Sequence, residues 1–137
     1  MRQITAGGGE NQPLRITATS SNTDLIANPS VIYTSAESTG SLTFTPLADA
    51  NGSTVITVTV EDGGLDDDLD TTGDNATTTN SFTVTVTPVN DLPALAALSD
   101  LTLNEDAPEQ NINLSGIMAG GGESQPLRVT TSSSNTS

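Results

Sequence analysis

The sequence predicts an all-β protein, a seven-stranded antiparallel β-sandwich. Apolar residues alternate with polar ones, mostly threonine, in short runs, and no stretch shows the 3.6-residue period of an amphipathic helix. Clusters of Asn, Asp, Gly and Pro separate these runs. Many short strands joined by such turns, with no helices between them, are typical of two packed sheets.

The first three predicted strands are short. Leu14–Thr19 alternates Leu, Ile and Ala with Arg and Thr, so its apolar side chains share one face. Val31–Thr34 is a brief β-branched and aromatic run. Ser41–Thr45 places Leu42 and Phe44 on one face. These three strands come before the turn around Gly52.

Four further runs complete the predicted set. Val55–Glu61 directs one Ile and two Val inward and two Thr outward, and Phe82–Thr87 repeats this alternation. Leu98–Leu103 offers two leucines at period two, and Asn111–Leu114 offers an Ile and a Leu. We therefore expect seven strands, with the last two following the linker from Pro88 to Pro93.

An internal repeat sets the organisation of the chain. The residues from Ile4 to Asp24 read ITAGGGENQPLRITATSSNTD, and those from Ile117 to Ser137 read IMAGGGESQPLRVTTSSSNTS. Fifteen of these 21 positions are identical, at an offset of 113 residues. Such a match predicts tandem domains, and the glycine-rich segment is expected to be a turn that recurs once per domain.

The repeat is cut out of phase, so the strands are present in circularly permuted order. We expect residues 1–92 to hold the later strands of one repeat, and residues 93–137 to hold the first strands of the next. The second segment can complete the sandwich within its own chain, or in a neighbouring subunit, head to tail, as a filament. A simpler interpretation is a frayed carboxyl-terminal tail.

Composition restricts the function. Three arginines against 17 acidic residues give a formal net charge of −14, which argues against nucleic acid and anionic membrane as partners. The absence of His, Cys and Lys excludes disulfides, Cys/His zinc sites and the usual catalytic bases. Three aromatic residues are few for a glycosidase, and no apolar run is long enough to insert into a membrane. The sequence therefore predicts no enzyme. High charge also fits disorder, against which the strand periodicity argues.

The acidic residues concentrate in one long connection. It follows the strand ending at Glu61, and a hairpin there needs only a few residues. Alternate aspartates resemble the ligand spacing of calcium loops, although the Gly and Glu of an EF-hand are missing. We expect Ca²⁺ as the cofactor, with a mobile acidic loop as the alternative. The candidate ligands here are Asp62, Asp66, Asp68, Asp70 and Asp74.

A second acidic set lies at the predicted domain junction. Asn90 and Asp91 belong to the linker, and Glu105 and Asp106 follow the strand after it. Because sandwich strands run from end to end, we expect these side chains to converge with Asp62 at one pole as further calcium ligands. Ordinary turn chemistry explains the same residues without a metal.

These segments carry a family resemblance. Val58–Gly64 reads VTVEDGG, the linker has Asn-Asp-x-Pro, and Asn104-Glu105-Asp106 follows. The chain resembles the cadherin-like and related Ig-like tandem repeats of large bacterial surface proteins. The resemblance implies an Ig-like fold, calcium between domains at Asp62, Asn90, Asp91 and Glu105, and extracellular stalks, adhesins or fibres. Pro88 and Leu92 replace two cadherin linker ligands, so it implies one or two ions.

The sequence thus predicts a structural, calcium-stabilised repeat of an extracellular adhesin or fibre on the bacterial cell surface. Its expected partners are neighbouring copies or repeats of itself, with glycans or a cell surface as further candidates. A calcium-dependent carbohydrate-binding module is the alternative, because it would use the same acidic residues.

Overall fold

The structure is a computed structural model, and it describes residues 3–135. The chain divides into two compact units, Met1–Pro88 and Val89–Ser137, with the division inside the predicted linker. All regular secondary structure in the described residues is strand, apart from one 3-10 turn, η1 (Gly64–Asp66). The all-β prediction is therefore confirmed.

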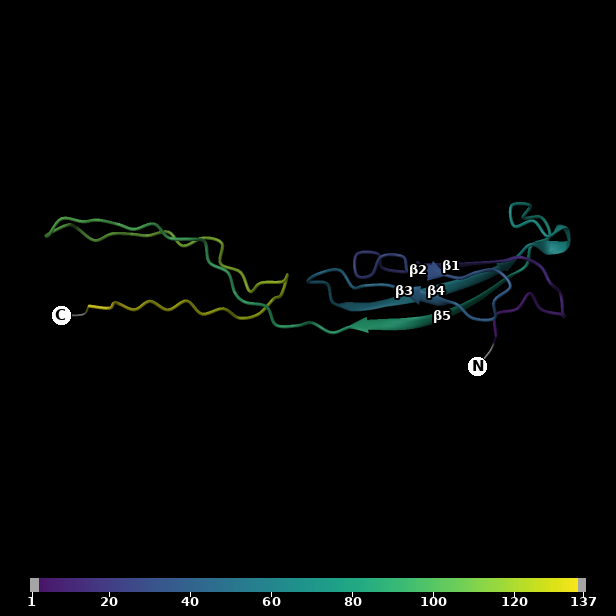
Figure 1. Ribbon diagram of the computed structural model, residues 1–137. Helices are drawn as coiled ribbons and strands as arrows, with labels where there is room; N and C mark the ends of the chain where they lie inside the picture. Colours follow the sequence, from purple (N-terminus) through teal and green to yellow (C-terminus); the bar gives the residue numbers. More distant parts are fainter. Residues whose placement is uncertain (1–2, 136–137) are drawn as a thin grey trace. The chain divides into compact units, whose positions relative to one another are not determined.

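The larger sheet has three antiparallel strands in the order β1-β4-β5. The strands are β1 (Leu14–Ser20), β4 (Gly52–Asp62) and β5 (Thr77–Val86), with β4 in the centre (Figure 1). The register places Ala18 opposite Val58 and Ile56 opposite Phe82. Threonine occupies many of the intervening positions, which suits a pleated surface with one solvated face.

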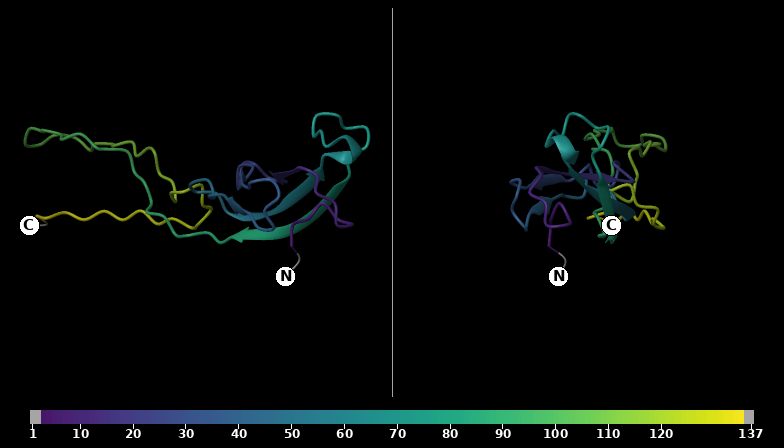
Figure 2. Two further views of the ribbon diagram at one scale, coloured as in Figure 1. Left: turned by 45° about the vertical axis from the view of Figure 1, so that its right-hand side comes forward. Right: turned by 90° about the vertical axis from the view of Figure 1, so that its right-hand side faces the viewer.

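A second, smaller sheet pairs β2 (Ser30–Ile32) with β3 (Ser41–Thr43). A cavity between the two sheets is lined from both sides, which shows that their apolar faces are turned toward each other. The two-layer arrangement of this unit can be followed in Figure 2. The residues lining this cavity are Ile4, Ile16, Val31, Gly40, Ser41, Leu42 and Val58.

The core of the first unit is small and aliphatic. Leu25, Ile26 and Ile56 are almost fully buried and pack together, with Val58 and Val84 among the partly buried side chains against them. Thr54 is a buried polar side chain: its Oγ1 accepts a hydrogen bond from Asn22 N at 3.0 Å and shares one with Ser20 Oγ at 2.9 Å. These bonds offset the cost of burying the hydroxyl.

The second unit consists mainly of an arm, which we define as residues 94–118. At its base, Ala94 and Met118 exchange both backbone hydrogen bonds, at 2.9 and 3.3 Å. The arm turns back at Asn104, where Ala107 N donates to Asn104 O. Its leucines are half exposed, for example Leu98 at 56% and Leu101 at 54%. The arm therefore presents apolar side chains without burying them.

Five of the seven predicted strands are present in the described residues. The segments predicted as strands, Leu98–Leu103 and Asn111–Leu114, are not strands and have no ladder partner. The repeated copy of β1 behaves in the same way. Leu14 is 6% exposed and pairs with β4, whereas Leu127, 113 positions later, is 45% exposed outside any strand. A strand needs a partner for its backbone groups, and the second unit provides none along these segments.

Candidate functional site

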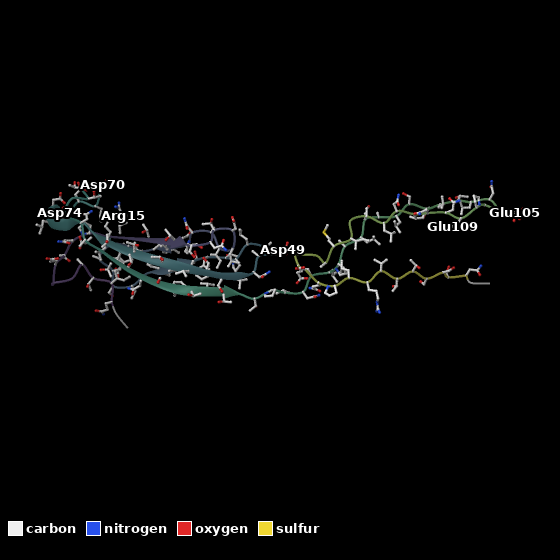
Figure 3. The ribbon with its side chains drawn as sticks, turned by 180° about the vertical axis from the view of Figure 1, so that it is seen from behind. Arg15, Asp49, Asp70, Asp74, Glu105 and Glu109 are labelled. Atoms are coloured by element: carbon white, nitrogen blue, oxygen red, sulfur yellow. The ribbon has the colours of Figure 1, made fainter. Side chains whose placement is uncertain are left out.

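Arg15 anchors the long acidic connection between β4 and β5. Its Nε and Nη2 donate to Glu61 Oε2 at 3.0 and 2.7 Å, and Nη2 also donates to Leu69 O at 3.1 Å. Arg15 Nη1 lies 3.7 Å from Asp70 Oδ1 (Figure 3). Hydrogen bonds from Arg15 and then Asn75 lower the pKa of Glu61. One cation on β1 therefore offsets part of the charge of this loop.

Two aspartates fix the ends of this loop. Asp62 Oδ1 accepts from Gly64 N at 3.1 Å and from Ala76 N at 2.9 Å, so it holds both ends together. Asp74 Oδ2 accepts from Leu65 N at 2.7 Å. Backbone N–H donors thus occupy oxygens of both predicted calcium ligands, as in ordinary aspartate turns.

The alternate aspartates are also used within the loop. Asp66 Oδ1 accepts from Asp68 N at 3.1 Å, and Asp68 Oδ1 accepts from Asp70 N at 2.9 Å. Asp68 Oδ2 accepts from Thr71 Oγ1. In the described part of the chain, no three acidic side chains converge to form a group that could hold a metal ion in these positions. Asn75 Oδ1, beside this loop, is buried and receives no hydrogen bond within residues 3–135, and the same holds for Gln12 Oε1.

The predicted junction ligands lie at two places in the second unit. Asp91 is at the base of the arm, where its N–H donates to Glu123 Oε2 at 3.3 Å and its carbonyl accepts from Asn90 Nδ2. Glu105 and Asp106 are in the turn at the tip, as Figure 3 shows for Glu105. The second unit does not gather these four residues, and Asp62 belongs to the first unit.

The glycine-rich turn recurs, as predicted. In the first unit Gly7, Gly8 and Gly9 have φ of 92, 52 and 83°, and in the second their counterparts have 93, 46 and 70°. Glu10 N donates to Gly7 O at 2.9 Å, and Glu123 N donates to Gly120 O at the same distance. Three successive left-handed residues require glycine, which explains the GGG sequence in both copies.

The first unit leaves apolar surface open. The outer strand β5 carries Phe82, which is 42% exposed although it points to the same face as buried Ile56. Its ring lies 6.4 Å from that of Phe44, itself partly exposed. A groove on this sheet is lined by residues of β1, β4, β5 and the amino-terminal segment, among them Thr5, Leu14, Val60 and Asn80. This half-covered sandwich is the principal candidate site.

Comparisons with known proteins found no matching family model, no similar curated protein and no similar solved structure. Across residues 3–135, no helix is long and apolar enough to cross a membrane.

Sequence reasoning missed Arg15, Asn75 and Glu123. The signal for Arg15 was an arginine inside a strand of an almost cation-free chain, but its partner depends on the register with β4. Glu123 could have been found as the repeat counterpart of Glu10.

Proposed function

We propose that this chain is a structural repeat unit of an extracellular bacterial adhesin or surface fibre, and not an enzyme. In this proposal, the sandwich of the first unit is completed by the arm of a neighbouring copy, head to tail. The observation that carries the proposal is the pairing of two incomplete parts: a half-covered sandwich with exposed Phe82, and an arm with exposed leucines. Exposed apolar surface and unpaired strand edges favour association.

The strand order supports an Ig-like sandwich that lacks its first two strands. In an Ig-like domain the strands C, F and G form one sheet, and A, B, E and D form the other. The order β1-β4-β5 matches C-F-G, and the pair β2-β3 matches D-E in chain order. Strand B would then join the free edge of β3. The arm carries the two missing segments, so Asn111–Leu114 is proposed to pair along β3 with Leu98–Leu103 beside it.

Calcium binding by the acidic loop is part of the proposal. Asp66, Asp68 and Asp70 follow one another at alternate positions, and the orphaned Asn75 Oδ1 is an oxygen of the kind that calcium takes. The carboxylates now accept N–H bonds, so binding would require them to turn toward a shared ion. Because binding would neutralise the loop, it would also stabilise the first unit.

Size in solution tests the proposal. We expect sedimentation velocity of the full chain to show oligomers that grow with protein concentration, and negative-stain electron microscopy to show unbranched fibres. A heterologous contact that does not close produces such open chains. A compact monomer at every concentration, with and without millimolar calcium, would contradict assembly as the function.

A further inference from the structure

The second copy of the glycine turn, Gly120–Glu123, is covered by the linker that precedes the arm. A methyl group added at Gly120 would strike Leu92 O, and one at Gly121 would strike the Asp91 carboxylate. The neighbouring Ala119 is 8% exposed. The linker is therefore seated closely on the backbone of this turn.

The contact continues along the repeat. Ala94 pairs with Met118 through both backbone hydrogen bonds, and Leu95 lines a cavity with residues that follow the turn. The other residues lining that cavity are Pro93, Ala94, Ile117, Pro126, Leu127, Arg128, Val129 and Thr130. The segment Asp91–Leu95 thus covers both the turn and the start of the second copy of β1.

The first copy of the same turn, Gly7–Glu10, is bare. A methyl group at Gly7 or at Gly9 would meet no atom within 4 Å in the described residues. The three glycines and Glu10 are exposed, although their counterparts Gly120, Gly121 and Glu123 are partly buried. A groove lined by Ile4, Thr5, Ala6 and Leu14 opens beside this copy. Closely similar backbone geometry is thus covered in one unit and uncovered in the other.

We infer that the bare turn Gly7–Glu10 and the groove beside it are a docking site for the segment Asp91–Leu95 of a second copy of this chain. The inference rests on the proposed function and identifies where the neighbouring copy begins to bind. The same segment of its own chain is already seated on Gly120–Glu123, so the two copies of the turn compete for it. Before assembly, Gly120–Glu123 binds the segment Asp91–Leu95 of its own chain. During assembly, Gly7–Glu10 of the next subunit binds that segment instead.

The repeat offset gives the intermolecular contacts. Ala94 of the second copy pairs with Thr5, as Ala94 pairs with Met118 within one chain. The N–H of the second copy's Asp91 donates to Glu10, as Asp91 N donates to Glu123. Its Leu95 lies against Leu14 and Ile16, the counterparts of two residues that line the cavity with it in the second unit.

Disulfide trapping tests this register, because the natural chain has no cysteine. Residues that exchange both backbone bonds have Cα atoms about 5.5 Å apart, within the range that a disulfide spans. A full chain with Thr5→Cys is mixed with a full chain with Ala94→Cys under mild oxidation. We expect a covalent heterodimer, and a ladder of covalent oligomers from the double variant. Ala94→Cys with Met118→Cys is the positive control, and Thr19→Cys, at an exposed position of β1, replaces Thr5→Cys as the negative control.

A matched glycine pair separates docking from local strain. Gly7→Ala and Gly120→Ala place a methyl group on backbones with φ of 92 and 93°, so their intrinsic strain is equal. Only the second meets its own linker. We expect Gly120→Ala to release the linker and increase trapping several-fold, and Gly7→Ala to reduce it several-fold.

Each result decides the inference. Trapping of Thr5 with Ala94 between chains, raised by Gly120→Ala and lowered by Gly7→Ala, supports it. If the disulfide forms only within single molecules of the double variant, the segment that docks on Gly7–Glu10 does not come from a second copy, and the inference is wrong. Assembly under reducing conditions without trapping would overturn the register alone and leave the proposed function intact, whereas no assembly at all would contradict both.

Discussion

Arg15 and Glu61 lie opposite each other in the β1–β4 register, and Arg15 Nη2 donates to Glu61 Oε2 at 2.7 Å. The same Nη2 reaches Leu69 O at 3.1 Å, so one side chain connects the sheet to the acidic loop. The pair therefore explains how the segment from Glu61 to Asp74, which holds seven acidic residues, keeps a defined conformation next to the sheet.

Arg15→Gln should loosen the acidic loop. Without the guanidinium, the loop loses its contacts with Glu61 and Leu69, and its like charges repel each other without a countercharge. We expect faster amide exchange at Leu65, Asp68 and Ala76, whose N–H groups bond within the loop and at its ends. Hydrogen exchange followed by NMR measures this.

Arg128→Gln is the matched control for that change. Arg128 occupies the same repeat position, yet the described residues give it no ion pair, and both variants remove one positive charge. Its amide exchange pattern in the loop should match that of the parent chain. Equal loosening by both variants would show that net charge, and not the Arg15 contact, holds the loop.

Acid should weaken the first unit through Glu61. Hydrogen bonds from Arg15 and Asn75 lower its pKa below the ordinary value of 4.5. A carboxyl group with a lowered folded pKa stabilises the fold above the unfolded pKa, and this contribution is lost as the pH falls through the folded value. Urea midpoints of the parent and Glu61→Gln should therefore differ at about pH 6 and converge as the pH falls through the folded pKa of Glu61. A constant difference at all these pH values would contradict the assignment.

The strands were predictable where the chain contains both strands of a hydrogen-bonded pair. The alternation in β4 and β5 identified them. β5 begins earlier than predicted because the polar residues Thr77–Ser81 continue the ladder, and β4 begins earlier because Gly52–Thr54 pair with the end of β5. The sequence LRITATS forms β1, whereas its repeat copy from Leu127, LRVTTSS, forms no strand although four of the seven residues are identical. Periodicity reports which face could be buried, but pairing also needs a neighbour, which lies outside the local pattern.

The candidate site was predictable only in part. The repeat located the glycine turn and the linker, and the acidic run located the loop. The cross-strand register that brings Arg15 to Glu61 could not be read from spacing, since a shift of one residue would turn either side chain to the other face. The prediction that Asp91 and Glu105 converge required both residues to lie at adjacent strand ends. In the structure Asp91 is next to the base of the arm at Ala94, whereas Glu105 is in the turn that begins at Asn104, at the other end of an extended segment.

Calcium should raise the unfolding temperature if the acidic loop binds it. A ligand present at about 100 times its Kd stabilises the folded state by about 2.7 kcal/mol. We expect an upward shift between chelator and millimolar calcium, lost in Asp68→Asn and reduced in Asn75→Ala. Asp49→Asn, which changes a turn aspartate outside the loop, should keep the shift. Identical unfolding temperatures of the parent chain in chelator and calcium would exclude calcium as a stabilising ligand.

The small aliphatic core should be sensitive to truncation. Ile56 is fully buried among Leu25 and Ile26, so Ile56→Ala should cost about 2–4 kcal/mol of unfolding free energy. Ile32→Ala, at a position that is 65% exposed, should change it by less than about 0.5 kcal/mol. Urea unfolding measures both. A small effect of Ile56→Ala would mean that the first unit is held by contacts other than this cluster.

Assembly should depend on the apolar side chains of the arm. Leu101 and Ile112 are 54 and 55% exposed, and in the proposed assembly a neighbouring sandwich buries them. Leu101→Asp or Ile112→Asp would place a charge in that apolar interface, which is costly without a partner. We expect either change to abolish the concentration-dependent oligomers in sedimentation velocity. The urea midpoint of the first unit should stay unchanged at protein concentrations where the parent chain is also monomeric, because the neighbouring arm then stabilises neither protein.

Leu65→Asp is the control for the arm variants. Leu65 is 89% exposed in the acidic loop, and the change adds the same single negative charge as each arm variant. This protein should therefore assemble like the parent, because its altered residue lies outside the arm. If Leu65→Asp blocked assembly equally, general charge repulsion would explain the loss. If Leu101→Asp and Ile112→Asp assembled normally, the arm would not be the segment that completes the neighbouring sandwich.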